Sequence, residues 1–180
     1  MKATGIVRRI DDLGRVVIPK EIRRTMRIRE GDPLEIFTSP DGDVVFKKYS
    51  PVGEMSHFAA EYADVLYKTG EAPVLVCDKD HVIAAAGIPK REVVDRRVSV
   101  ALEDLMNLRK NAVYSGSEGE QLRPVEGLDR YVLACQPIIS SSDVCGAVMF
   151  INSEKVVAAK ETQVKLVESA ALFMGRQMEG

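Results

Sequence analysis

The chain has 180 residues, enough for two small domains or one of medium size, and 46% of its residues are hydrophobic and 29% charged. These fractions are typical of a globular protein and exclude an intrinsically disordered chain. The net charge of −2 conceals an asymmetry: residues 1–29 hold nine basic and three acidic side chains, a local charge of +6, so the remainder must sum to −8.

The basic N-terminal segment indicates a polyanionic partner. Seven of its nine basic residues are arginines, whose guanidinium groups suit bidentate contacts with phosphate and with guanine. Charge asymmetry between the two ends of a chain favours such a partner at the basic end. On charge alone, a solvated basic face is an equal alternative.

The three cysteines, Cys77, Cys135 and Cys145, have neither a close pairing nor a metal-ligand spacing. We expect buried, reduced thiols and no metal site, because only two histidines are available. We find no signal-peptide pattern after Lys2, and the longest apolar runs are far shorter than the roughly twenty residues that a membrane span needs. The sequence therefore predicts a cytoplasmic protein with no membrane partner.

The first fifty residues read as a small domain of short strands and tight turns. The expected elements are a strand at 5–10, a turn at 11–14, a strand at 15–18, a helix at 20–26, and a hairpin of 34–38 with 44–48. Pro19 opens the helix at a position where a missing N–H costs nothing. A unit of this size leaves much apolar surface exposed, so we predict an obligate dimer with a shared core.

Composition changes after residue 50. We predict a domain at 1–50, a linker at 51–54 and a second domain at 55–180. The second domain is expected to contain helices at 54–68, 98–110 and 155–178 and strands at 72–77, 82–87, 112–114, 130–139 and 144–151. Strands flanked by helices at both ends predict an α+β fold of the sensor type.

The last predicted helix carries two apolar stripes. One follows heptad positions and comprises Val157, Val164, Val167, Ala171, Met174 and Met178; the other comprises Leu166, Ala170 and Phe173. One stripe can cover the sheet, and the second favours a bundle between chains and hence a tetramer. A single broad stripe that faces the core is an equal alternative.

The N-terminal motif is long and specific. Residues 7–19 read Val-Arg-Arg-Ile-Asp-Asp-Leu-Gly-Arg-Val-Val-Ile-Pro, and residues 21–24 read Glu-Ile-Arg-Arg. Over about residues 1–50 the chain closely resembles the swapped-hairpin DNA-binding domain of the AbrB-type transition-state regulators. With its length and second domain, the whole chain is similar to sporulation regulators of this type that carry a GAF-type sensor domain behind the first domain.

The resemblance implies an α+β protein in which a swapped-hairpin, β-barrel-like dimer domain precedes a GAF-like α/β sensor domain with flanking helices. It implies a sequence-tolerant transcription regulator of sporulation genes, activator or repressor and not an enzyme, that binds double-stranded AT-rich DNA in the nucleoid. The family's DNA-contacting positions match Arg8, Arg9, Arg15, Arg23 and Arg24. Arg8 lies close to Asp11 and Asp12, so an internal ion pair competes with DNA contact there.

GAF-like domains often hold a small molecule, so the resemblance also implies an unidentified effector, with no other cofactor expected. The candidate pocket residues are Cys77, Ala85, Tyr114, Cys135 and Pro137. A packed dimerisation domain without ligand is an equal alternative.

Two other functions remain open. A GAF-like cysteine redox enzyme needs an activated thiolate, which cysteines in apolar runs do not suggest. An antitoxin is possible because related swapped-hairpin domains occur in toxin–antitoxin pairs, although those proteins end in short disordered tails.

Overall fold

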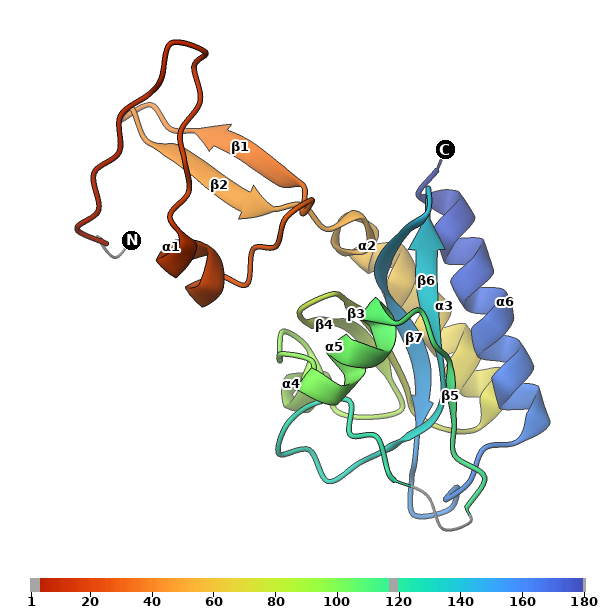
Figure 1. Cartoon of the computed structure of the whole chain (residues 1–180). Coiled ribbons are helices and arrows are strands. Elements are labelled where there is room, and N and C mark those ends of the chain that lie inside the picture. The colour runs from red at the N-terminus through yellow and green to blue at the C-terminus, as the bar shows by residue number, and fades with distance from the viewer. Residues whose placement is uncertain (1–3, 117–119, 180) are drawn as a thin grey trace. The chain divides into compact units, whose positions relative to one another are not determined.

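The computed structural model describes residues 4–116 and 120–179, and the chain divides into two compact units, Met1–Tyr49 and Ser50–Gly180 (Figure 1). Residues 51–54, which we expected to be a linker, form the short helix α2 (Pro51–Glu54). Ser50 caps this helix by accepting a hydrogen bond from the Gly53 amide at 3.0 Å, and Val52 is buried in the core of the second unit. The segment is helical because a serine cap precedes a proline at the first helical position.

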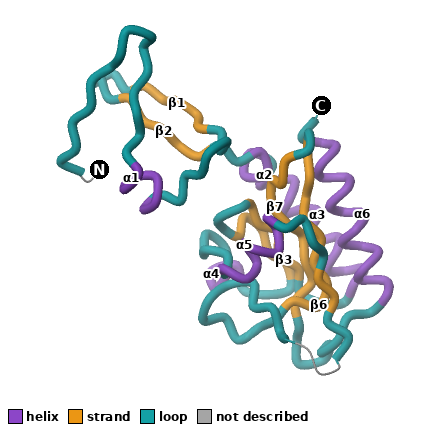
Figure 2. Tube along the Cα trace, viewed as in Figure 1, coloured by secondary structure: helices purple, strands orange, loops and turns teal. Residues whose placement is uncertain are grey.

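The first unit contains helix α1 (Lys20–Thr25) and an antiparallel hairpin of β1 (Leu34–Thr38) and β2 (Val44–Lys48), joined by loops (Figure 2). The hairpin has the predicted bounds. Its turn is closed by the Ser39 amide, which donates to the Asp43 carbonyl at 3.0 Å, and by Gly42 with a φ of 87°. A glycine accommodates that backbone conformation without strain.

The two strands predicted at 5–10 and 15–18 are absent from this single chain. The turn between them is present, since the Gly14 amide donates to the Asp11 carbonyl at 3.0 Å and the Asp11 amide to the Arg15 carbonyl at 3.1 Å. A strand requires a neighbouring strand for its amides and carbonyls, and neither segment has one among the described residues. Their apolar side chains stay in solvent, with Val7 87% and Val17 71% exposed.

The second unit is built on a five-stranded antiparallel sheet with the strand order β4-β3-β7-β6-β5. The strands are β3 (Val74–Asp78), β4 (Val82–Ala86), β5 (Ala112–Val113), β6 (Val132–Ser140) and β7 (Asp143–Ile151). All five lie within two residues of the predicted strands, because each coincides with an apolar run between polar turns.

Helices cover both faces of this sheet (Figure 1). One face packs against α3 (Ser56–Gly70) and α6 (Glu161–Gln177), and the other against α4 (Lys90–Val93), α5 (Val100–Asn107) and the adjoining loops. Val74 and Val76 of β3 face the first layer, and Leu75 and Cys77 face the second. Burial on both faces explains why the strands read as continuous apolar runs.

Helix α6 begins at Glu161, six residues later than predicted. Residues before it form an irregular segment, in which the Ala159 amide donates to the Tyr114 carbonyl at 2.8 Å. Gln163 is fully buried and donates from Nε2 to the Gly70 carbonyl at 2.8 Å, which ties the start of α6 to the end of α3. A hydrophobic pattern does not reveal a buried glutamine of this kind.

Within residues 4–116 and 120–179, no helix is long and apolar enough to cross a membrane. The same ranges contain no cluster of three or more side chains suited to hold a metal ion.

Candidate nucleic-acid interface and a cavity in the second unit

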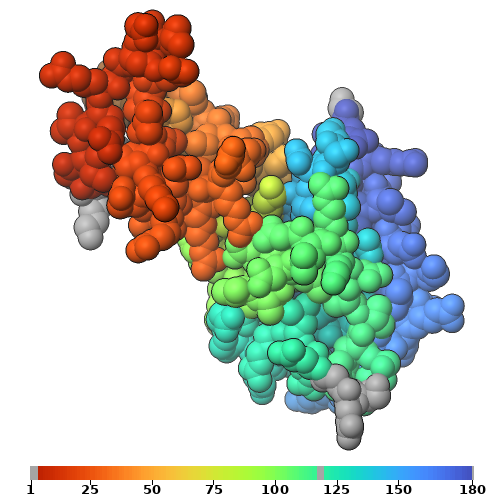
Figure 3. All heavy atoms as spheres, in the orientation of Figure 1, coloured from red at the N-terminus to blue at the C-terminus, as the bar shows by residue number. Residues whose placement is uncertain are grey.

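The five predicted DNA-contacting arginines lie on three short segments of the first unit. Arg8 and Arg9 precede the turn at Asp11–Gly14, Arg15 follows it, and Arg23 and Arg24 occupy the last turn of α1. All five side chains are exposed, and the segment that carries them forms part of the surface shown in Figure 3.

The turn is organised by the carboxylate of Asp11. Its Oδ1 accepts hydrogen bonds from the backbone amides of Leu13 (3.0 Å) and Arg15 (2.7 Å), and its Oδ2 accepts one from Arg15 Nε (2.8 Å). The hydrogen bond from the Arg15 amide, followed by that from the Arg15 side chain, holds the pKa of Asp11 below its usual range. The internal pair that we expected to compete at Arg8 therefore forms at Arg15, whose side chain remains 69% exposed.

The other four arginines have no side-chain partner among residues 4–116 and 120–179. Across the described residues, the side chains of Arg8, Arg9, Arg23 and Arg24 form no ion pair and no hydrogen bond. Each guanidinium therefore keeps five N–H donors and a full positive charge for an external partner. Such groups match phosphate oxygens in both geometry and charge.

The two lysines of β2 contact other residues of the first unit instead. Lys48 Nζ donates to the Arg27 carbonyl at 3.0 Å and lies 3.7 Å from Asp32 Oδ2. Lys47 Nζ lies 4.6 Å from the centre of the Phe37 ring. These contacts stabilise the hairpin and the segment before it.

Three of the five candidate pocket residues of the second unit lie together in its core. Cys77, Ala85 and Cys135 are buried in one core cluster, Pro137 is buried on β6, and Tyr114 is half-buried beyond β5. Burial raises the pKa of the Cys77 thiol well above its ordinary value and that of Cys135 to about 12. Both thiols are therefore protonated at neutral pH.

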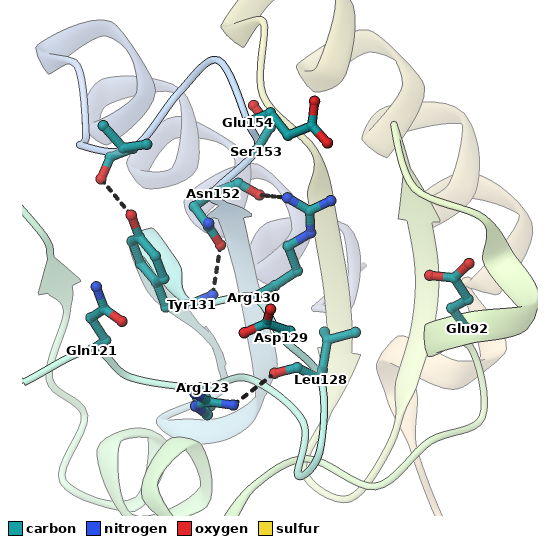
Figure 4. Close-up of a pocket in the computed structure, with 11 residues that line it drawn as sticks. Glu92, Gln121, Arg123, Leu128, Asp129, Arg130, Tyr131, Asn152, Ser153 and Glu154 are labelled. Atoms are coloured by element: carbon teal, nitrogen blue, oxygen red, sulfur yellow. Dashed lines mark hydrogen bonds between the residues drawn. The ribbon is translucent and has the colours of Figure 1, made fainter.

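A cavity of about 590 Å³ lies elsewhere in the unit (Figure 4). Its lining comes from α4, from the segment before β6 and from the segment after β7, and includes Glu92, Gln121, Arg123, Leu128, Asp129, Arg130, Tyr131, Asn152, Ser153, Glu154 and Val157. None of the five candidate residues lines this cavity. The ring of Tyr114 packs edge to face against that of Tyr131, which does line it, with the ring centroids 5.0 Å apart. The signal that sequence reasoning missed is the density of polar and charged residues in these two loops.

Comparison with known proteins supports a two-part chain. Residues 54–179 match the family described as stage V sporulation protein T C-terminal, transcription factor, and residues 7–53 match the family described as antidote-toxin recognition MazE, bacterial antitoxin. Stage V sporulation protein T of Bacillus subtilis (strain 168) is 50% identical over 181 residues, which cover 99% of each chain.

Each unit also has its own relatives. The transition state regulatory protein AbrB of Bacillus subtilis (strain 168) is 59% identical over 51 residues, which cover 28% of this chain and 52% of AbrB. The GAF domain of a phosphoenolpyruvate-protein phosphotransferase from Coxiella burnetii is 13% identical, covers 69% of this chain and 82% of that one, and superposes with a TM-score of 0.53. This likeness confirms the predicted GAF-like fold. With an AbrB-like domain in front and a family match that spans the second unit, the chain belongs to the stage V sporulation protein T family of transcription factors.

Proposed function

We propose that the first unit binds double-stranded, AT-rich DNA through Arg8, Arg9, Arg15, Arg23 and Arg24, and that the protein thereby activates or represses sporulation genes from the nucleoid. The observation that carries the proposal is the set of four exposed guanidinium groups that have no partner in the described chain. Contacts to phosphates carry no sequence information, which accounts for a loose sequence preference. The ease with which a sequence deforms supplies the preference for AT-rich sites.

The proposed DNA-binding form is an obligate dimer. Among the described residues of the first unit, Pro19 alone is buried, and many apolar side chains lie in solvent. Ile10 and Leu13 are each 69% exposed and Ile36 is 62% exposed. A second copy that exchanges hairpins supplies both the missing apolar contacts and the strand partners that residues 5–10 and 15–18 lack.

A salt titration of DNA binding tests this proposal. With about 6–8 phosphate contacts per dimer, a plot of log K against log[salt] should have a slope of about −5 to −7. The measurement uses fluorescence anisotropy of the full chain on AT-rich and GC-rich duplexes of equal length. A salt-independent affinity, or a monomeric mass by light scattering, contradicts the proposal.

We also propose that the second units join two dimers into a tetramer. Three aromatic rings pack together: Phe58 and Tyr62 on α3 and Phe173 on α6. The centroids of each pair of rings are 5.8 Å apart, and Phe173 is 43% exposed. Val65, one helical turn beyond Tyr62 on the same stripe, is 52% exposed. These four residues, here called the α3/α6 aromatic face, form an apolar surface suited to pack against its own copy.

An antitoxin function is the second candidate, because residues 7–53 match the MazE antitoxin family. It is disfavoured because a folded GAF-like unit occupies the place of the short toxin-wrapping tail. Purification of the full chain from its native cells decides between them: a small toxin retained in stoichiometric amount would support the antitoxin function.

We further propose that the protein is not an enzyme. The buried, protonated thiols of Cys77 and Cys135 lack the exposure and low pKa that redox catalysis requires. Thiol titration of the native protein should leave both cysteines unmodified until the protein is unfolded. Reductase turnover that is lost in Cys135→Ser would contradict this assignment.

A further inference from the structure

The cavity of the second unit is lined by charged side chains of both signs. Its volume of about 590 Å³ falls in the range of small-molecule sites. Two guanidinium groups, from Arg123 and Arg130, and three carboxylates, from Glu92, Asp129 and Glu154, line it. In Figure 4 Asp129 lies between the two arginines, and Glu92 faces the site from α4.

Backbone carbonyls hold the guanidinium groups of Arg123 and Arg130 in position without neutralising their charge. Arg123 Nη1 donates to the Leu128 carbonyl at 3.3 Å, and Arg130 Nη1 donates to the Asn152 carbonyl at 3.4 Å. A backbone carbonyl has no net charge, so each guanidinium keeps its positive charge and its other N–H donors. Although three carboxylates line the same cavity, neither arginine forms an ion pair within residues 4–116 and 120–179.

The surrounding wall is held in place by hydrogen bonds. The Tyr131 amide donates to Asn152 Oδ1 and the Tyr131 hydroxyl to the Val157 carbonyl, each at 2.8 Å. Ser153 Oγ accepts a hydrogen bond from the Val156 amide at 3.1 Å. These contacts join the segments before β6 and after β7, so the charged side chains project from a preformed frame.

We propose that this cavity binds a small zwitterion that carries both a carboxylate and an ammonium group, the chemistry of a free amino acid. A guanidinium pairs with the ligand's carboxylate, and the carboxylates of Asp129, Glu92 or Glu154 receive its ammonium group. The five charges that the described residues contribute to the lining sum to −1, so a nucleotide or other polyphosphate would meet net repulsion. Ligand binding itself does not depend on the function proposed above. Only the role of this ligand as an effector of DNA binding rests on that function.

The test is calorimetric titration of the full chain with the standard L-amino acids, one at a time and without DNA. We expect at least one to bind, while its N-acetyl derivative and its amide, which each lack one charge, bind at least about tenfold more weakly. Arg130→Gln and Asp129→Asn should each weaken binding roughly ten- to hundredfold. If no amino acid binds at millimolar concentration, or if the N-acetyl derivative binds as well as the parent, the proposal is overturned.

Arg109→Gln is the matched control. Arg109 is exposed, whereas Arg130 is half-buried; like Arg130, it donates to a backbone carbonyl, that of Ser142 at 2.6 Å, but it does not line the cavity. This variant should bind the ligand like the unmodified chain, and equal losses in Arg109→Gln and Arg130→Gln would overturn the assignment. The titration contains no DNA, so it tests the ligand site separately from DNA binding. A chain that binds the amino acid but not DNA would refute the proposed function and leave the ligand site supported.

Discussion

At the scale of single residues, the first unit separates two kinds of basic side chain. Arg23 and Arg24 have no partner in the described chain, whereas Lys48 is bonded to the Arg27 carbonyl and lies near Asp32. Both kinds look alike in a charge count. The difference depends on contacts between residues some twenty positions apart, so charge and motif predict the DNA-facing arginines only as a group.

Replacing Arg23 should therefore change DNA binding without unfolding the protein. In Arg23→Ala we expect weaker binding to every duplex and a salt slope lowered by about two per dimer, since each phosphate contact contributes about one. The measurement is the salt titration by fluorescence anisotropy, with Arg109→Ala in the second unit as a control that retains the full slope. An unchanged slope in Arg23→Ala would show that this side chain does not contact DNA.

Gly175 of α6 is a second informative residue, because it lets the helix approach the sheet closely. A Cβ at this position would clash with the carbonyl oxygen of Ile139 on β6. We expect Gly175→Ala to lower the free energy of unfolding by about 1–3 kcal/mol, although alanine favours helix. Ser169→Ala, at an exposed position of the same helix, should be neutral or slightly stabilising. Equal stability of the two variants in urea unfolding would contradict close packing at Gly175.

At the scale of elements, local pattern predicts some segments well and others poorly. The hairpin of β1 and β2 is found with its predicted bounds because both strands pair across a short local turn. Residues 15–18 have similar strand-forming residues but no strand partner in the part of the chain that the structure describes. Helix α6 starts later than predicted because residues 152–159 form other contacts, such as the hydrogen bond from the Ala159 amide to the Tyr114 carbonyl. Strand and helix ends thus depend on distant partners that periodicity does not contain.

The turn at Asp11–Gly14 should depend on acid pH. The pKa of Asp11 is lower in the folded chain than its ordinary value of about 3.9, so the carboxylate stabilises the turn fully above that value. The stabilisation is lost as the pH falls through the folded pKa. We expect the amide resonances of Leu13 and Arg15, the two donors to Asp11, to shift together with a midpoint below about 3.9. This transition should be absent in Asp11→Asn; if it persists there, or if its midpoint lies above 3.9, the assignment of the carboxylate fails.

At the scale of the whole molecule, the proposed assembly rests on apolar surface that one chain leaves uncovered. The first unit has almost no core of its own, and the second has a complete core plus the α3/α6 aromatic face. Removing part of α6 would not test the tetramer cleanly, because Val167, Ala171 and Met174 of that helix cover the sheet. A surface substitution is the better test.

Val65→Lys should convert the tetramer into dimers. Val65 is half exposed in the single chain, so a lysine there leaves the fold intact while it places a charge in the proposed interface. Light scattering should show the mass halved, and the near-ultraviolet circular dichroism of the full chain should show that the aromatic side chains keep their folded environment. Asp64→Lys, at the neighbouring exposed position, should keep the tetramer. A tetrameric mass in both variants would place the interface elsewhere.

The sequence by itself determined the two-part organisation, the α+β class, the strands of the sensor-like sheet and the family, because each rests on local periodicity or on a contiguous motif. Only the tertiary structure decided which charges are paired, where α6 begins, and where the polar cavity lies. The cavity joins residues 121–131 with residues 152–157 and with α4. Its existence depends on how distant segments meet in space, and no local pattern of apolar and polar residues encodes that meeting.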